Sequence, residues 1–237
     1  MTVFNPRISF DAAPWRLSGV VYGTLLSDRA AMAAIGEAAN QPPYKAAPKA
    51  PVLYVKPRNT LANSGSTVAV PDDSGEFEIG ASLGLVFGRT ACRVSEADAI
   101  AYLSGYTLVA DLSVPHDSFY RPSVRFKARD GSFIFGPRVV ACNQIASPDT
   151  LTLRVSVDGQ VVHRASNAGM QRSVARLIAE VTDFMTLRAG DVLLLGVAAG
   201  APHVRAGQRF AIESDASELG QIEGALVNEA STQEHAA

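Results

Sequence analysis

The stretch EFEIGASLGLVFG, from Glu76 to Gly88, decides the fold of this chain. An acidic entry is followed by an apolar run that Gly88 closes, which is typical of a β-strand. Similar runs rich in Val, Leu and aromatic residues recur between Gly, Pro, Asp or Asn residues: VVYGTLL, VLYV, YTLVADLSV, LTLRVSV, VLLLGVA and RFAIES. The chain is therefore predicted to be mainly β.

A two-residue Asp-Gly turn, Asp158 and Gly159, separates LTLRVSV from QVVHRAS. Such a turn needs positive φ at both central positions, and it joins two antiparallel strands. A hairpin is expected there.

Three segments are predicted to be helical. Ser95, with Asp98 three residues later, caps EADAIAYLS, which Gly105 ends. Between Met170 and Met185 apolar residues recur at the 3.6-residue period, which predicts one buried helix face made by Val174, Leu177, Ile178, Val181 and Phe184. An Ala-rich third segment covers residues 27–39.

The domain organisation is expected to be simple. No internal repeat or low-complexity linker divides the chain, which favours a single domain over residues 16–229. Residues 1–15 are expected to form a loosely ordered arm and residues 230–237 a disordered tail, because unpinned termini are usually loose.

Composition excludes several classes of function. The chain has 237 residues, of which 47% are apolar and 19% charged, and a net charge of -2. A basic face for nucleic acid or an anionic membrane is therefore not expected. The absence of a long apolar run and of a signal-peptide pattern predicts a cytoplasmic protein. Cys92 and Cys142 have no CxxC spacing, so neither a disulfide framework nor a zinc site is expected, and both are predicted to be buried thiols.

Several blocks resemble one enzyme family. They are GRTACRVSEADAIAYLSGYTLVADLSV, SFYRPSVRFKARDG, FGP, SVDGQVV and LRAGDVLLLGVAAG. They are similar to the fumarylacetoacetate hydrolase family, and most similar to the amino-terminal half of its two-part isomerase/decarboxylase members from 4-hydroxyphenylacetate catabolism. The resemblance covers about residues 16–229 and implies a β roll with a few peripheral helices.

The resemblance also implies a metal site, which this sequence lacks in part. The family binds Mg²⁺ or Mn²⁺ through a Glu-x-Glu pair on one strand and an Asp on another, and the metal holds the oxygens of a 2-oxo acid. Counted back from Gly88, the paired positions are Gly80 and Ser82, and neither can be an anionic ligand. The third position is kept as Asp111, which either pairs with a cation or orients a substrate group.

Glu76 and Glu78 lie four residues before those positions. In an extended strand this is a displacement on the order of 13 Å, at about 3.3 Å per residue. Metal ligands lie at roughly 2.0–2.6 Å, so only a bulge or a bent entry brings these acids to the site. No metal is therefore expected, unless Glu76 or Glu78 substitutes and holds Mg²⁺ or Mn²⁺; otherwise they are solvated acids.

The hydrolases of the family activate water with a His and a Glu in a lid segment. The matching stretch here is GTLLSDRAAM, where Arg29 and Met32 occupy those places. Losing a general base lowers a rate by roughly 10² to 10⁴. Carbon-carbon bond hydrolysis is therefore disfavoured.

The remaining charged positions favour an acidic substrate, because charge-assisted contacts to carboxylates are strong. The resemblance implies a catalytic role for Lys127 and Asp111, and substrate binding by Lys56, Arg58, Arg121 and Arg129. The alternative is that Arg121 and Arg129 pair with Asp117 and Asp130. His116 either shuttles a proton or is a surface residue.

By resemblance, the predicted activity is that of an isomerase/decarboxylase. It converts 5-oxopent-3-ene-1,2,5-tricarboxylate to 2-hydroxyhepta-2,4-diene-1,7-dioate and isomerises the product through a dienolate. The alternatives are a catalytically silent subunit that pairs with a metal-binding paralogue, and a metal-dependent acylpyruvate-type hydrolase. The expected partners are a di- or tricarboxylate 2-oxo acid and either a second copy or a paralogous subunit.

Overall fold

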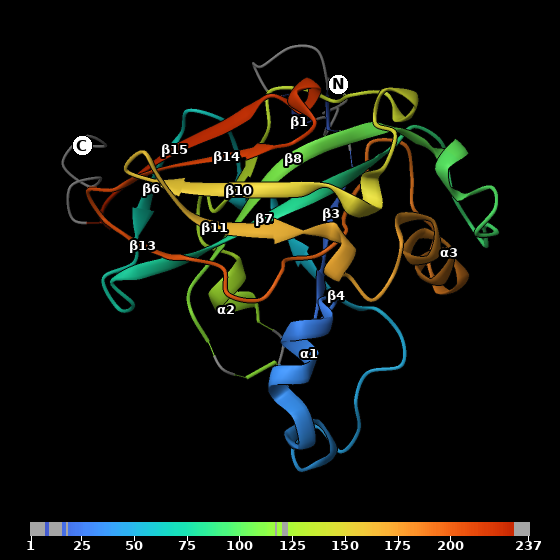
Figure 1. Cartoon of the computed structure of the whole chain (residues 1–237), viewed down its shortest axis with the longest axis horizontal. Helices are drawn as coiled ribbons and strands as arrows, with labels where there is room; N and C mark the ends of the chain where they lie inside the picture. Colours follow the sequence, from blue (N-terminus) through green and yellow to red (C-terminus); the bar gives the residue numbers. More distant parts are fainter. Residues whose placement is uncertain (1–7, 10–15, 18, 117, 120–122, 230–237) are drawn as a thin grey trace, which may run out of the picture.

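Two curled β-sheets form the body of the protein, as a computed structural model shows for residues 8–9, 16–17, 19–116, 118–119 and 123–229. The larger sheet has the strand order β4-β3-β12-β7-β8-β9-β5, with β13 paired to β7. The smaller sheet has the order β11-β10-β14-β15-β6 (Figure 1). The prediction of a mainly β roll with a few peripheral helices is confirmed.

The elements have the following bounds. The larger sheet contains β3 (Val21–Leu25), β4 (Val52–Lys56), β5 (Leu61–Asn63), β7 (Glu76–Phe87), β8 (Leu103–Ser113), β9 (Phe133–Phe135), β12 (Val192–Leu194) and β13 (His203–Arg205). The smaller sheet contains β6 (Thr67–Val70), β10 (Thr152–Val157), β11 (Gln160–Ser166), β14 (Arg209–Ser214) and β15 (Gln221–Asn228), while β1 (Ile8–Ser9) pairs with β2 (Arg16–Leu17). The α-helices are α1 (Arg29–Ile35), α2 (Val124–Lys127) and α3 (Val174–Phe184). The short 3-10 helices are η1 (Gly36–Asn40), η2 (Arg58–Thr60), η3 (Ala99–Tyr102), η4 (Cys142–Gln144), η5 (Pro148–Thr150), η6 (Asn167–Gly169) and η7 (Ser217–Leu219).

The main core lies between the two sheets. Successive side chains of a strand point to opposite faces, so β7 sends Phe77, Ile79 and Leu83 into this core. The small sheet supplies Ile212 and Ile222 to the same cluster. The other face of β7 therefore points away from the small sheet, and it carries the acidic and small residues of the opening stretch.

The centre of the larger sheet is the long antiparallel pair β7 and β8. Its register places Glu78 opposite Ser113, Gly80 opposite Asp111 and Ser82 opposite Val109. Glu76 and Glu78 are thus the first residues of the strand itself, although the sequence suggested that they precede it. Asp111 also has Phe133 of β9 on its other side, so it lies within the sheet.

The predicted hairpin is confirmed. Strands β10 and β11 pair with Val157 opposite Gln160, and the turn residues Asp158 and Gly159 have φ of 49° and 81°. This is the backbone geometry that the Asp-Gly dipeptide favours.

The helix predictions are borne out unevenly. Helix α3 begins after the N-cap Ser173, whose side chain accepts from the Arg176 amide, and it buries the predicted face except Phe184, which is 59% exposed. The prediction for EADAIAYLS was wrong: only the 3-10 helix η3 forms, and β8 starts at Leu103. Gly105 does not end a helix but lies in β8, where a Cβ would overlap the Val140 carbonyl.

The Ala-rich segment forms α1 followed by η1, and it projects from the body (Figure 1). Asp28 caps α1, because its Oδ1 accepts from the Ala31 amide at 2.9 Å. The same oxygen accepts from the Ala199 amide at 3.3 Å, so one buried carboxylate fastens the helix to the segment 197–200.

The remaining predictions concern the termini and the cysteines. Apart from the short strand β1, the predicted arm at 1–15 lies outside the described residues, as does the tail at 230–237. The single domain over 16–229 stays a prediction. Both thiols are free, but Cys92 is exposed and Cys142 half-buried, so the prediction of two buried thiols was wrong. None of the helices in the described ranges has the length and apolar character needed to span a bilayer.

The Asp28→Ala variant should lower the free energy of unfolding by about 1–2 kcal/mol, the usual range for loss of an N-cap. Urea unfolding followed by circular dichroism measures the change. Asp28→Asn keeps an oxygen at the capping position and should stay within about 0.5 kcal/mol of the wild type. Equal unfolding midpoints for all three proteins would contradict the role given to Asp28.

Candidate functional site

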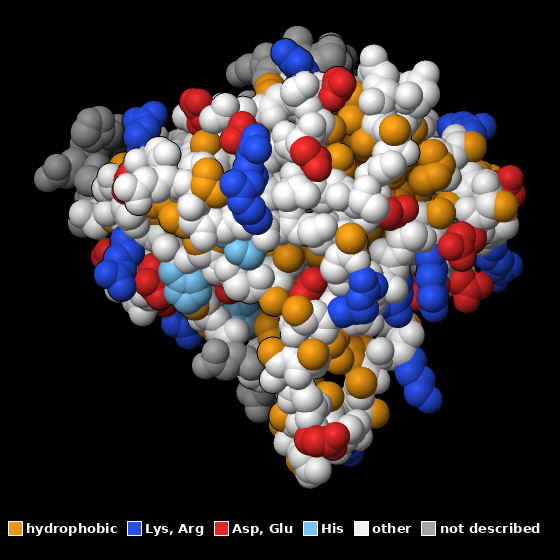
Figure 2. All heavy atoms as spheres, in the orientation of Figure 1, with side chains coloured by type: hydrophobic (Ala, Val, Ile, Leu, Met, Phe, Trp, Pro, Cys, Tyr) orange, Lys and Arg blue, Asp and Glu red, His pale blue; other side chains and the backbone are white. Residues whose placement is uncertain are grey.

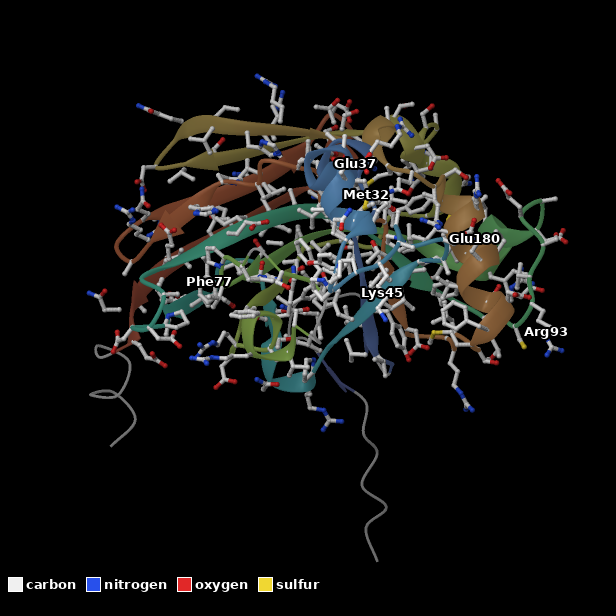
Figure 3. All side chains as sticks on the ribbon, turned by 90° about the horizontal axis from the view of Figure 1, so that it is seen from below. Met32, Glu37, Lys45, Phe77, Arg93 and Glu180 are labelled. Atoms are coloured by element: carbon white, nitrogen blue, oxygen red, sulfur yellow. The ribbon has the colours of Figure 1, made fainter. Side chains whose placement is uncertain are left out.

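A cavity of about 630 Å³ lies on the face of the large sheet that points away from the small sheet. Strands β4, β7 and β8 form its floor, with Tyr54, Glu78 and Asp111. The segment 197–200, the residues after β8, and α2 form further walls. Helix α1 and η1 cover it. This segment carries the labels Met32 and Glu37 in Figure 3, where it lies nearest the viewer.

The wall made by α1 and η1 is apolar. Ala31, Ala34, Ile35 and Ala38 all line the cavity from this side. Hydrophobic side chains also gather on the surface of the projecting lobe (Figure 2). The cavity is therefore polar on its floor and apolar under its cover, which suits a ligand with an acidic group and a hydrocarbon part.

Asp111 is the centre of the polar floor. Its side chain has no exposed surface, and an ionised carboxylate in such a position must be paired. Lys127 Nζ lies 2.8 Å from Oδ2, Lys56 Nζ lies 2.9 Å from Oδ1, and the Tyr54 hydroxyl donates to Oδ2. Of these contacts, the one between Lys56 and Oδ1 is an ion pair outside hydrogen-bond geometry.

Lys56 is fully committed to holding this network together. Its side chain is 0% exposed, and besides its ion pair with Asp111 its ammonium group donates to three acceptors: the Lys127 carbonyl, Ser132 Oγ at 3.1 Å and the Leu112 carbonyl at 3.4 Å. An ammonium group has three hydrogens, so no donor remains for a ligand. Lys56 therefore positions Asp111 and α2.

Lys127 is placed differently. It is the last residue of α2, and its side chain lines the cavity with 9% exposed. Within the described part of the chain its ammonium group donates to one acceptor, Asp111 Oδ2, and it lies 4.8 Å from the centre of the Tyr54 ring. Two N–H groups are thus available to a ligand in the cavity.

Tyr54 is a site residue that the sequence reasoning missed. It lies two residues before Lys56 on β4, so both side chains point to the same face of the sheet. Gly23 of β3 makes room for the ring, because a Cβ there would overlap it. The alternation in YVKP was the available signal.

The electrostatics of the floor follow from burial and pairing. Burial opposes ionisation of Asp111, but the ammonium groups of Lys127 and Lys56 outweigh it and hold the carboxyl pKa below its ordinary value. Burial lowers the pKa of Lys56, while Asp111 acts in the opposite direction. Burial and the nearby Asp111 raise the pKa of Tyr54 well above 10.0, so the phenol stays protonated.

The residues predicted to occupy the family's metal positions do not fit a divalent cation. A Cβ on Gly80 would lie 2.7 Å from Val197 Cγ2, so the space for an acidic side chain is filled. Ser82 Oγ accepts from the Gly196 amide at 3.2 Å. Asp111 already faces two ammonium groups, and no cluster of three His, Cys, Asp or Glu side chains suited to a metal occurs among the described residues.

The two acids of the opening stretch have separate surroundings. Glu76 lies outside the cavity, where it pairs with His203 at 2.9 Å and with Arg205 at 3.3 Å, both on β13. Glu78 lines the cavity and is partly exposed. Glu78 is therefore the acid of this pair that a ligand can meet.

Two of the predicted arginines, Arg58 and Arg129, are not brought to the cavity. Arg58 is exposed and lines a different hollow beside β3 and β4. Arg129 pairs with Asp73 at 3.1 Å, as does Arg125, whereas Asp130 accepts from Asn59. Arg121 and its suggested partner Asp117 lie outside the described residues.

The structure also locates three further predicted positions, Arg29, Met32 and His116. Arg29 donates to the carbonyl groups of Met170 and Ala168, which anchors α1, and neither Arg29 nor Met32 lines the cavity. His116 lines the cavity, but its Nδ1 lies 2.9 Å from the Val114 carbonyl and its ring is stacked on Phe126. It is thus a half-buried wall residue.

Comparison with known proteins gives consistent relatives. The profile of the family described as fumarylacetoacetate (FAA) hydrolase C-terminal matches residues 20–227. The 4-hydroxyphenylacetate degradation bifunctional isomerase/decarboxylase of Escherichia coli is 35% identical over 83% of this chain. The chain spans only 44% of that relative's length. The oxaloacetate tautomerase YcgM of Escherichia coli K12 is 28% identical over 73% of this chain and 82% of its own.

Solved structures show the same fold. A fumarylpyruvate hydrolase from Pseudomonas aeruginosa, in complex with Mn²⁺ and pyruvate, superposes with a TM-score of 0.78 at 22% identity, over 97% of this chain and 99% of its own. A 5-carboxymethyl-2-hydroxymuconate delta-isomerase from Mycobacterium smegmatis gives 0.75 at 25% identity, over 90% and 80%. The named relatives are enzymes: isomerase/decarboxylases, tautomerases and hydrolases. The chain belongs to the fumarylacetoacetate hydrolase family.

Proposed function

We propose that the cavity binds an acidic 2-oxo acid or its enol and catalyses isomerisation through an enolate. The observation that carries this proposal is Lys127, a cation held in place by Asp111 with two donors open to the cavity. The specific reaction proposed is that of an isomerase/decarboxylase in 4-hydroxyphenylacetate catabolism. Its substrates are 5-oxopent-3-ene-1,2,5-tricarboxylate and 2-hydroxyhepta-2,4-diene-1,7-dioate.

The chemistry of both steps suits this floor. Loss of carbon dioxide leaves its bonding electrons in a dienolate, and isomerisation removes the enol proton to give the same kind of anion. In each case negative charge develops on the oxygen at C2, where a preorganised cation stabilises it. Lys127 is the cavity residue suited to this task, because Lys56 has no free donor.

The apolar cover supports a substrate with a hydrocarbon section. The conjugated chain of the diene would lie against Ala31, Ala34 and Ile35, with one carboxylate and the C2 oxygen directed to Lys127. Relatives named for this pathway support the assignment, and relatives named as oxaloacetate tautomerases support the shared enol chemistry. Arg58 and Arg129 have no part in the cavity chemistry proposed, and the cytoplasmic location stays a prediction.

Hydrolysis is the less favoured activity. Arg29, at the place of the water-activating His, is used to anchor α1, and Met32 is not a base. A metal-dependent hydrolase would also need acids that Gly80 and Ser82 do not supply.

A catalytically silent subunit is the second candidate. It is favoured by the altered residues at the predicted metal positions, Gly80 and Ser82. A second chain with an intact Glu-x-Glu pair would then perform the reaction, and self-association into a homodimer is the alternative assembly. Turnover by the purified chain alone would exclude the silent-subunit candidate, whereas turnover only with the paralogue present would support it.

Lys127→Met should reduce turnover of 2-hydroxyhepta-2,4-diene-1,7-dioate by about 10²- to 10³-fold, which corresponds to one lost stabilising donor of about 3–4 kcal/mol. Loss of the diene absorbance measures the rate. The variant should still fold, because Lys56 and Tyr54 remain on Asp111. Arg125→Met on the same helix, an exposed residue paired with Asp73, is the control and should match the wild type.

Chelation should leave the activity of the purified chain unchanged. The reason is that Gly80 and Ser82 offer no carboxylate, while Asp111 is neutralised by two lysines. The same absorbance assay with and without EDTA, together with metal analysis of the sample, tests this expectation. Activity that disappears with EDTA and returns with Mg²⁺ or Mn²⁺ would show that a metal takes part.

A further inference from the structure

Glu78 is an acid of the cavity to which the proposed function has so far given no role. It lies on β7 two residues before Gly80, so both positions share the face that also carries Asp111 of β8. Gly80 has no side chain, and Val197 of the segment 197–200 packs over it. Glu78 lines the cavity and is partly exposed.

The carboxylate of Glu78 is unpaired, in contrast to its neighbour on the same strand. Glu76 has both His203 and Arg205 as partners. Within the described ranges, the Glu78 side chain makes neither a hydrogen bond nor an ion pair. It interacts electrostatically with Tyr54. The two carboxyl oxygens of Glu78 are thus open to a molecule in the cavity.

Four other titratable groups of the cavity, Asp111, Tyr54, Lys127 and His116, are poorly suited to accept a proton. Asp111 is neutralised by two ammonium groups that keep its carboxyl pKa low. Tyr54 keeps its proton and donates it to Asp111. Lys127 must stay charged to stabilise an enolate, and the unpaired Nε2 of His116 is buried against the protein.

We infer that Glu78 is the proton-transfer residue of this cavity. Its carboxylate takes the proton of the substrate's C2 hydroxyl as that O–H bond breaks and the C2–oxygen double bond forms. The electrons move along the diene to its far carbon, and the protonated Glu78 gives its proton to that carbon, which forms the new C–H bond. Glu78 returns to its ionised form, so the isomerisation needs no co-reactant. This inference rests on the proposed function.

The test compares Glu78→Gln with Glu76→Gln, two isosteric changes on one strand. The substrate is 2-hydroxyhepta-2,4-diene-1,7-dioate, followed by its absorbance and by deuterium incorporation in D₂O. Glu78→Gln should slow both by about 10²-fold or more, the usual effect of losing a general base. Oxalate, a mimic of the enolate, should bind Glu78→Gln as tightly as the wild type or more tightly, because a nearby negative charge is removed. Glu76→Gln should change neither turnover nor binding.

Two outcomes would overturn the inference alone: wild-type turnover in Glu78→Gln, or parallel loss of turnover and oxalate binding in that variant. A Lys127→Met variant that keeps full turnover while Glu78→Gln loses it would contradict the proposed role of Lys127 and leave Glu78 standing. A wild-type chain that neither turns over the diene nor binds oxalate would overturn both proposals.

Discussion

A buried ionised carboxylate, that of Asp111, is the constraint on which the rest of the site depends. It lies within the central strand β8 with no exposed surface. An unpaired charge in such a place destabilises a fold by several kcal/mol. Its two cations come from segments far apart in the chain, Lys56 on the edge strand β4 and Lys127 at the end of α2. Neutralising Asp111 therefore fixes where both elements lie against the sheet. The cavity floor follows from that placement.

The two lysines are equivalent in charge but not in use. All the N–H donors of Lys56 bind protein acceptors, so its role is structural. Lys127 uses one donor on Asp111 and has the others open to the cavity. The residues at the positions predicted for the family's acids, Gly80 and Ser82, are likewise used for contacts within the protein. The space beside Gly80 is filled by Val197, and Ser82 holds the backbone of the adjoining turn through the Gly196 amide. Restoring a Glu at position 80 alone would meet Val197, so the altered strand and the altered turn belong together. Packing of this kind is difficult to reverse one residue at a time.

The sequence predicts those features that depend on local chemistry. The Asp-Gly hairpin, the amphipathic helix α3 and the long strands follow from turn chemistry and periodicity, and the family blocks identify Asp111 and Lys127. EADAIAYLS was misjudged because local capping at Ser95 was outweighed by pairing of the following residues with β7. Partners remote in sequence could not be derived either. Arg129 forms an ion pair with Asp73, and Glu76 forms ion pairs with His203 and Arg205. The hydrogen bond from Tyr54 to Asp111 forms only once β4 is placed at the sheet edge. The ion-pair partners of Glu76 come from β13, which pairs with β7 across a large sequence separation and places Arg205 opposite Glu76 and His203 opposite Glu78.

The charge balance of the cavity also limits how an acidic ligand can lie in it. Lys56, Lys127 and Asp111 together carry a net positive charge of one, and Glu78 adds a negative charge at the same floor. A ligand carboxylate is therefore favoured near Lys127 and disfavoured near Glu78. The cover of α1 and η1 offers apolar side chains and no charge from Ala31, Ala34, Ile35 or Ala38. In the function proposed above, the carbon chain of a substrate held at Lys127 would run beneath this cover, and Glu78 would move its proton. The two carboxylates on neighbouring strands thus have opposite environments: Asp111 is paired with two cations, and Glu78 is open to the cavity. Environments that separate two acids in this way are how enzymes assign them different tasks.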